Sequence, residues 1–314
     1  MRILVTGGAG FIGSNLVRAS LEAGDEVRVL DDLSTGREEN LHGLERDVEF
    51  VRGSVTETAL VELAVRNCEV VFHQAALASV PRSVADPVAT HRANVLGTLC
   101  LLDAAREAGV RRVVLASSSS VYGDTAVLPK EEAMVPSPRS PYALQKLTVE
   151  RYCEQYLRLY RLDSIALRYF NVFGPRQDPE SDYAAVIPLF IRALGSSERP
   201  RIFGDGHQSR DFTYVDDVVR ANRCAAMAPT EAAGAVLNIA RGGRVTLLEL
   251  IDAIAAAFGK EPPEPIFEAP REGDVLHSEA AVERAASVLG WSAKVSLEQG
   301  LRETVAYFTG RRPT

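Results

Sequence analysis

The chain has 314 residues, of which 46% are hydrophobic and 25% charged, so it is long enough to bury a core and is not a disordered protein. Its formal net charge is −7 and its lysines and arginines form no block, which argues against non-specific binding of nucleic acid. An anionic ligand would therefore need arginines concentrated at its site. The four cysteines are widely separated, no apolar run approaches a membrane span, and the start MRILVTGG lacks the profile of a signal peptide. We expect a cytoplasmic protein without a membrane segment, a disulfide framework or a metal site.

Short apolar runs alternate with helical patterns through the first half of the chain. The helical patterns cover residues 11–21, then 87–108 ending at Gly109, and 141–161 opening at Ser140-Pro141. The expected strands are residues 2–5, 26–30, 48–51, 70–72, 112–115 and 165–167. Short, nearly all apolar strands separated by helices predict an α/β fold with a doubly wound parallel sheet.

The second half is less regular. After Gly174-Pro175 the chain is rich in Pro, Gly and Arg, and helical patterns return at residues 215–227, 246–258, 280–289 and 297–308. We expect residues 1–170 to form a dinucleotide-binding domain, with parts of 205–240 returning to it. Residues 171–314 would then form a smaller, interleaved substrate lobe.

A glycine-rich loop, GGAGFIG at residues 7–13, follows the first strand and opens the first helix. In this context glycines allow a tight turn and a close approach of the backbone to a pyrophosphate, while the helix N-terminus attracts its charge. Asp31 ends the second strand, where a carboxylate accepts a ribose 2′-hydroxyl and repels a 2′-phosphate. The pattern predicts an NAD site, with an ordinary glycine turn as the alternative.

Tyr142 and Lys146 are four residues apart at the start of a long helix, so they share one face. A phenol has a pKa of about 10, and an adjacent ammonium lowers the cost of its ionisation. Four serines at residues 117–120 follow the fifth strand, at the end of the sheet where ligands bind. The alternatives are a solvated helix face for the Tyr and Lys pair and a strand-end turn for the serines.

Together the segments TGGAGFIG, HQAA, SSSSVYG, YALQK, LRYFNVFGPRQ and SRDFTYVDDV resemble the extended short-chain dehydrogenase/reductase family, and within it the nucleotide-sugar 4-epimerases. The resemblance covers essentially the whole chain. It implies a Rossmann-type domain that holds NAD and a C-terminal lobe that holds a UDP-sugar. It also implies a homodimer formed through two long helices of each subunit, expected at 87–108 and 141–161, where Leu99, Leu101 and Leu102 fit either the dimer face or the core.

The resemblance assigns roles residue by residue. Tyr142 resembles the catalytic base, Lys146 the residue that lowers its pKa, and Ser118, four residues before Tyr122, the catalytic serine. The implied cofactor-binding residues are Gly7, Gly10, Phe11, Ile12, Gly13, Asp31, Asp32, Ser54, Val55, Gln74, Ala75, Ala76, Asn94, Ser117, Tyr142, Lys146 and Tyr169. The implied substrate-binding residues are Ser118, Ser119, Tyr142, Asn171, Arg210, Arg271, Asp274 and Ser278. Two positions depart from the family pattern: Ser54 stands where an acidic residue near the adenine is common, and Ala78 where some members have lysine.

The implied reaction is 4-epimerisation of a UDP-sugar by transient oxidation at C4. A small residue at Ser278 resembles members that accept N-acetyl sugars, so we expect UDP-GlcNAc and UDP-GalNAc to be used besides UDP-Glc and UDP-Gal; otherwise Ser278 is a helix cap. UDP-glucuronate 4-epimerisation is an alternative. A 4,6-dehydratase is a weaker one, because Ser119 and Ser120 stand where those enzymes carry an Asp-Glu pair for acid–base work. A non-catalytic NAD-binding sensor is disfavoured by the presence of Ser118, Tyr142 and Lys146.

Overall fold

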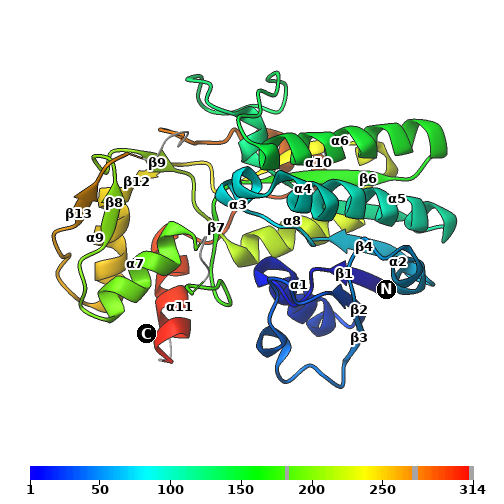
Figure 1. The fold of residues 1–314 in the computed structure, drawn as a ribbon, viewed down its shortest axis with the longest axis horizontal. Helices are drawn as coiled ribbons and strands as arrows, with labels where there is room; N and C mark the ends of the chain where they lie inside the picture. The colour runs from blue at the N-terminus through cyan, green and yellow to red at the C-terminus, as the bar shows by residue number, and fades with distance from the viewer. Residues whose placement is uncertain (181–183, 271–274, 311–314) are drawn as a thin grey trace.

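A seven-stranded parallel sheet forms the larger part of the molecule in the computed structural model, which describes residues 1–180, 184–270 and 275–310 (Figure 1). The strand order is β11-β6-β5-β4-β1-β2-β3, and every adjacent pair is parallel. The strands are β1 (Arg2–Thr6), β2 (Glu26–Asp31), β3 (Val48–Arg52), β4 (Val70–His73), β5 (Arg112–Ser118), β6 (Ser164–Tyr169) and β11 (Val236–Ile239). This order is that of a Rossmann-type fold with one further strand, and it confirms the predicted fold class.

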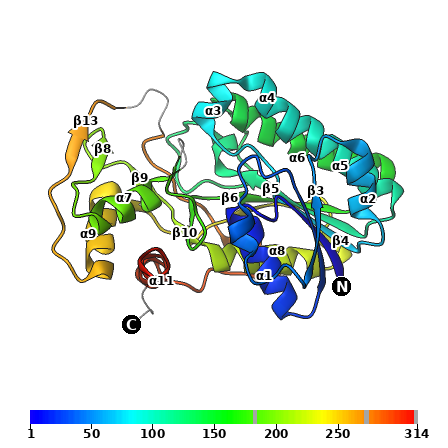
Figure 2. The same cartoon turned by 60° about the horizontal axis from the view of Figure 1, so that its bottom comes forward.

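Helices cover both faces of this sheet, because alternate residues of each strand are apolar and bury in opposite layers. Val5 and Val29 lie in one core, and Leu4 and Leu30 lie in the other. Figure 2 shows helices on both sides of the sheet. The first face carries α1 (Phe11–Glu22), α8 (Val215–Met227) and α10 (Glu283–Leu289), and the second carries α2 (Thr58–Val65), α5 (Gly97–Glu107) and α6 (Pro141–Tyr160). Two short helices, α3 (Val80–Ala85) and α4 (Pro87–His91), lie against the start of α6.

The smaller lobe has its own core, built around Phe173, Phe190 and Ile251. Its helices are α7 (Val186–Gly195), α9 (Leu247–Phe258) and α11 (Leu297–Thr309). Three small ribbons complete it: β7 (Val172–Phe173) with β10 (Thr213–Tyr214), β9 (Ser209–Arg210) with β12 (Val245–Thr246), and β8 (Arg201–Phe203) with β13 (Ile266–Glu268). Short 3-10 turns lie at η1 (Glu38–Leu41), η3 (Ser119–Tyr122) and η4 (Thr230–Ala232). Within the described ranges, no helix has the length and apolar character needed to cross a membrane.

Two expected helices differ in the structure. The helix expected at residues 87–108 is interrupted by one π-helical turn, η2 (Arg92–Leu96), between α4 and α5. This turn contains Asn94, whose side chain forms hydrogen bonds with the backbone of Leu77. Single π-helical turns within α-helices are frequent at functional sites. The helix expected at 280–289 begins only at Glu283, because Ser278 and Ala281 donate backbone hydrogen bonds to Ser209 and Lys130 in an extended segment.

The helix α7 was not expected from the sequence, which reads as irregular after Gly174. Two segments from the second half of the sequence also belong to the sheet region, because β11 pairs with β6 and α8 packs against one face of the sheet. The division into domains at residue 170 stays a prediction.

Candidate active site

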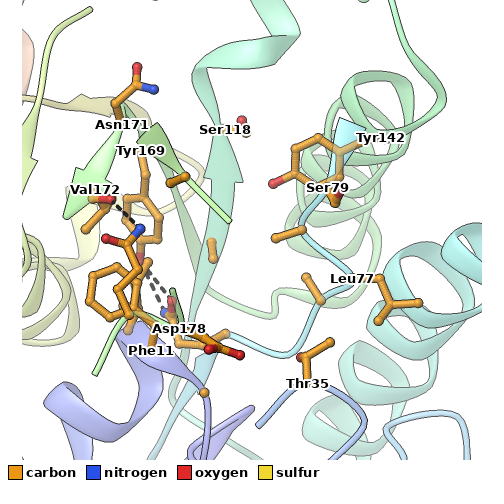
Figure 3. A pocket seen from close by; sticks show the side chains of 18 of the residues that line it. Phe11, Thr35, Leu77, Ser79, Ser118, Tyr142, Tyr169, Asn171, Val172 and Asp178 are labelled. Carbon is orange, nitrogen blue, oxygen red and sulfur yellow. Dashed lines mark hydrogen bonds between the residues drawn. The ribbon is translucent and has the colours of Figure 1, made fainter. Parts of the chain in front are cut away.

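A cleft of about 820 Å³ lies where the carboxyl ends of the parallel strands meet the smaller lobe. Figure 3 shows Tyr142 and Ser79 on one side of it, and Tyr169, Val172 and Asn171 on the other. Of the predicted site residues that the structure describes, all line this cleft except Asn94. Arg271 and Asp274 lie outside the described residues, and Asn94 is buried behind the cleft wall. The structure therefore brings nearly the whole predicted set together around one cavity.

The glycine loop shapes one end of the cleft. Gly7 has a φ of +67°, and a Cβ there would lie 2.7 Å from the backbone nitrogen of Ala75, while a Cβ at Gly13 would lie 2.0 Å from the Gly7 carbonyl oxygen. Only glycine fits at both positions. The N-cap of α1 is Gly10, which offers no side-chain cap, so the first-turn N–H groups face the cleft without a local side-chain acceptor. This cradle fits the pyrophosphate of a dinucleotide.

Asp31 sits at the end of β2 with its carboxylate buried. Its oxygens accept hydrogen bonds from the backbone N–H groups of Ala9 and Leu33, both at 2.8 Å, and burial raises the pKa of the carboxyl. A Cβ on Gly36 would lie 2.9 Å from Oδ1, so the backbone approaches this acid closely. Asp32, Ser54 and Val55 line the same end. A negative group at this position fits a ribose hydroxyl and opposes a 2′-phosphate, so the residues present suit NAD.

Tyr142 and Lys146 lie in the first turns of α6, which begins at the N-cap Ser140 with Pro141 in its first turn. The Lys146 Nζ donates a hydrogen bond of 2.7 Å to the Ala116 carbonyl oxygen and lies 5.8 Å from the centre of the Tyr142 ring. Burial raises the pKa of Tyr142 to about 12, and a hydrogen bond with Ser118 acts against this rise. Burial lowers the pKa of Lys146 to about 8, although the negative charge of Glu150 acts to raise it. The pair is thus a buried acid–base unit of the kind found at functional sites.

The serines after β5 have different surroundings. Ser118 Oγ accepts hydrogen bonds from the Ser120 N–H at 3.2 Å and the Ser120 hydroxyl at 2.9 Å, and it stays at the cleft wall beside Tyr142. Ser117 instead donates to Glu150 at 2.5 Å, so its hydroxyl is engaged within the helix–sheet interface. Ser119 opens the turn η3. Of the four, Ser118 is placed best to contact a substrate hydroxyl.

A second row of polar side chains supports the cleft wall. Asn94 bonds the backbone of Leu77 through both its amide atoms and donates to Gln145 at 2.8 Å, so it orders the strand-end segment that carries Leu77. Gln74 and Tyr169 both bond Asn222, on α8. Sequence reasoning missed Asn222 and also Gln145, although Gln145 lies within the YALQK segment, because their roles depend on long-range contacts.

The end of the cleft nearer the smaller lobe carries the substrate-binding candidates. Asn171 is exposed, Arg210 is partly buried with a hydrogen bond of 3.2 Å to the Leu276 carbonyl oxygen, and Ser278 is buried. Ser278 lies in the extended segment before α10, so the alternative that it caps a helix is wrong. Its backbone N–H bonds the Ser209 carbonyl oxygen, which leaves the side chain to line the cavity.

The cleft is basic although the chain is acidic. Among the described residues, its charged lining contains three acids, Asp31, Asp32 and Asp178, against a larger group of bases: Arg37, Arg82, Lys130, Lys146, Arg176, Arg201 and Arg210. This concentration matches the expectation that an anionic ligand needs locally clustered arginines. Sequence reasoning identified only Arg210 and Lys146 in this group, since the others stand in loops whose approach to the cleft only the fold reveals.

Comparisons with known proteins agree with this geometry. The sequence matches the NAD dependent epimerase/dehydratase family over residues 3–240, and the chain belongs to that family. It is 45% identical over 315 residues to a UDP-glucose 4-epimerase of Mycolicibacterium smegmatis, covering 99% of each chain. Among solved structures, a UDP-N-acetylglucosamine 4-epimerase from Methanobrevibacter ruminantium has a TM-score of 0.94 at 38% identity, covering 98% of both chains. A UDP-glucose 4-epimerase from Thermotoga maritima with UDP-glucose has a TM-score of 0.93 at 41% identity, covering 99% of both chains.

Proposed function

We infer that this protein is an NAD-dependent UDP-sugar 4-epimerase, an isomerase that inverts the configuration at C4 of the hexose. The observation that carries this inference is the position of Tyr142, Lys146 and Ser118 in one cleft, between a dinucleotide cradle and a basic end that suits a diphosphate. The relatives named above are 4-epimerases that match nearly the full length of the chain.

In the mechanism, Tyr142 accepts the proton of the sugar 4-hydroxyl as hydride leaves C4. The glycine loop and Asp31 would hold NAD, whose nicotinamide ring would supply a reversible hydride acceptor for C4. Ser118 hydrogen-bonds the 4-hydroxyl and orients it toward the phenol. Moving the pKa of Tyr142 from about 12 to near 7 requires about 7 kcal/mol of differential stabilisation of the phenolate. The Lys146 ammonium provides part of it from within the same buried site.

Inversion requires the 4-keto sugar to present its other face, so the nucleotide is held tightly and the hexose loosely. We propose that Arg210 and Asn171 hold the diphosphate together with Arg271, and that Asp274 contacts the ribose; Arg271 and Asp274 lie outside the described residues. Arginine suits this role because its guanidinium forms bidentate bonds with phosphate oxygens. Several small side chains line the cleft and leave room for the hexose to turn: Ala76, Ala78, Ser79, Ala184 and Ala185.

We further propose that the protein accepts UDP-GlcNAc and UDP-GalNAc as well as UDP-Glc and UDP-Gal. The small, buried Ser278 at the cavity wall supports this, because it leaves room for a 2-acetamido group. Epimerisation rates measured on the N-acetylhexosamine, hexose and glucuronate pairs test the choice. Turnover confined to UDP-glucuronate would overturn it, and loss of one water mass from the substrate would instead indicate a dehydratase.

We also propose a homodimer formed through the outer faces of α5 and α6. Leu144 and Leu159 of α6 are 55% and 59% exposed, and the neighbouring Leu96 is 43% exposed, so apolar surface remains on this face. Leu101 and Leu102 belong to the core, whereas Leu99 is half-buried. A double variant, Leu144→Glu/Leu159→Glu, should yield monomers in light scattering. Leu63→Glu, at an exposed leucine of α2, is the matched control and should leave the mass unchanged.

Two coarser assignments complete the proposal. We propose that residues 1–170, with parts of 205–240, bind the dinucleotide, and that the rest of 171–314 mainly binds the UDP-sugar. We also propose a cytoplasmic location, which is supported by four cysteines that are all unpaired, as in a reducing compartment. Fractionation of the native host with an antibody to this chain tests the location.

A further inference from the structure

A buried ion pair lies directly behind the catalytic pair. Glu150 of α6 is 5% exposed and Arg168 of β6 is 4% exposed. The guanidinium of Arg168 donates two hydrogen bonds to the carboxylate, from Nε at 2.9 Å and from Nη2 at 2.8 Å. Burying two charges costs free energy that their attraction often fails to recover, so such a pair is weak evidence for a stabilising role alone. Its position suggests a functional role instead.

Glu150 continues a series of contacts that joins α6 to the end of β5. Tyr142, Lys146 and Glu150 follow one another at intervals of four residues, so they share one face of the helix. Lys146 bonds the carbonyl oxygen of Ala116, and Glu150 accepts a hydrogen bond from Ser117. The next residue of β5 is Ser118, which pairs with Tyr142. Glu150 therefore fixes the strand one residue before the proposed catalytic serine.

Glu150 is also the negative charge that acts on Lys146. The groups that act on or lie near Lys146 come from two elements, Tyr142 and Glu150 from α6 and His73 from β4. Arg168 of β6 pairs with Glu150. His73 is neutral, because burial lowers its pKa to about 3, with a smaller contribution from the charge of Lys146. Burial disfavours the Lys146 ammonium, and the charge of Glu150 favours it. Without Glu150, the ammonium would face burial without a compensating negative charge.

We propose that Glu150 is a positioning residue of the epimerase reaction, which keeps Lys146 in its ammonium form and holds the end of β5 in register with Tyr142. The inference rests on the proposed function, since it needs Lys146 to assist Tyr142. Glu150 does not line the cleft, so it acts through Lys146 and Ser117 and not through the sugar. Arg168 in turn balances the charge of Glu150 within the sheet.

The test compares pH profiles of kcat for the holoenzyme and its variants. Glu150→Gln leaves Arg168 buried and unpaired, so the double variant Glu150→Gln/Arg168→Gln removes both charges and is the better-folded probe. In both variants Lys146 should lose its proton at lower pH, which moves the alkaline limb of kcat down by about one pH unit or more. Glu154→Gln is the matched control, because Glu154 is exposed on the same helix and pairs only with Arg151 in the described contacts.

Ser117→Ala separates the two parts of the proposal. It keeps the charge of Glu150 but removes the anchor of β5, so kcat should fall while the alkaline limb stays in place. A folded double variant with the wild-type pH profile would overturn the electrostatic part, and a wild-type kcat for Ser117→Ala would overturn the anchoring part. Wild-type protein without epimerase activity would instead contradict the proposed function, so the two failures are distinguishable.

Discussion

The Lys146 ammonium lies 5.8 Å from the centre of the Tyr142 ring, one turn further along α6 and on the same face of the helix. Tyr142 is half-buried and Lys146 is buried, and this desolvation raises the pKa of the phenol and lowers that of the amine. Burial thus shifts the two pKa values in opposite directions from those of the free side chains. Each group then depends on the other's charge when the phenolate forms.

Replacing Tyr142 by Phe should lower kcat by about 10²- to 10⁴-fold, because the substituted ring cannot accept the proton of the 4-hydroxyl. UDP binding, measured by calorimetry, should be unchanged, since the diphosphate site lies at the other end of the cleft. Tyr152→Phe, at a half-buried tyrosine of the same helix, is the control. Substantial residual activity in Tyr142→Phe would mean that another group acts as base.

Replacing Ser278 by Tyr should reduce turnover of UDP-GlcNAc by about tenfold or more while largely sparing UDP-Glc, because the larger ring occupies space next to the 2-substituent. Ser278→Ala, which keeps the cavity open, should retain both activities. Parallel rate measurements on the two substrates check this. Equal loss of both activities in Ser278→Tyr would show that this side chain does not face the 2-substituent.

His73 should make the protein less stable in acid. Its ring is buried between the hydroxyls of Thr6 and Thr98, at 2.7 and 2.8 Å, and burial lowers its pKa to about 3. The unfolded chain binds a proton on this histidine below about pH 6.5, and the folded protein only below about pH 3. The free energy of unfolding should therefore fall as pH drops from 6.5 to 3, by about 5 kcal/mol in total for this group.

The pH dependence of His73 is isolated by comparing urea unfolding of wild type and His73→Gln at several pH values. Other groups contribute to both curves, including Asp211, whose pKa burial raises to about 6, so the difference between the two proteins is the informative quantity. That difference should shrink as pH falls through the window. A constant difference would contradict a neutral, buried histidine.

Replacing Gly13 by Ala should abolish NAD binding, because the new Cβ would lie 2.0 Å from the Gly7 carbonyl oxygen and force the loop off α1. Gly195→Ala is the matched control, since a Cβ at this helix terminus meets only the Phe258 ring, at 3.7 Å. Fluorescence titration with NAD compares the two variants. Wild-type affinity for NAD in a folded Gly13→Ala protein would contradict the proposal that the glycine loop binds the pyrophosphate.

Much of the larger domain was predictable because its signals are local. Apolar runs such as 70–72 match the strands of the structure to within one residue, and Ser140-Pro141 marks the start of α6. The glycine loop and the Tyr142–Lys146 spacing are likewise short-range patterns. They locate the cleft because parallel strands end at a common edge.

The features that could not be predicted depend on contacts between distant segments. The π turn at η2 reflects the bonds of Asn94 to Leu77, and the late start of α10 reflects the pairing of Ser278 with Ser209. The charge of Arg176 was unremarkable in the sequence, yet its side chain reaches Asn15 of α1 and lines the cleft. No single-sequence pattern encodes such long-range partners.

The most direct test of the account is proton NMR of UDP-glucose incubated with the protein in deuterated water. Direct transfer and return of hydride predicts an equilibrium mixture of UDP-glucose and UDP-galactose, with hydrogen and not deuterium at C4, and with no net reduction of added NAD. Deuterium at C4, or no turnover of any UDP-sugar by folded, NAD-saturated protein, would contradict it.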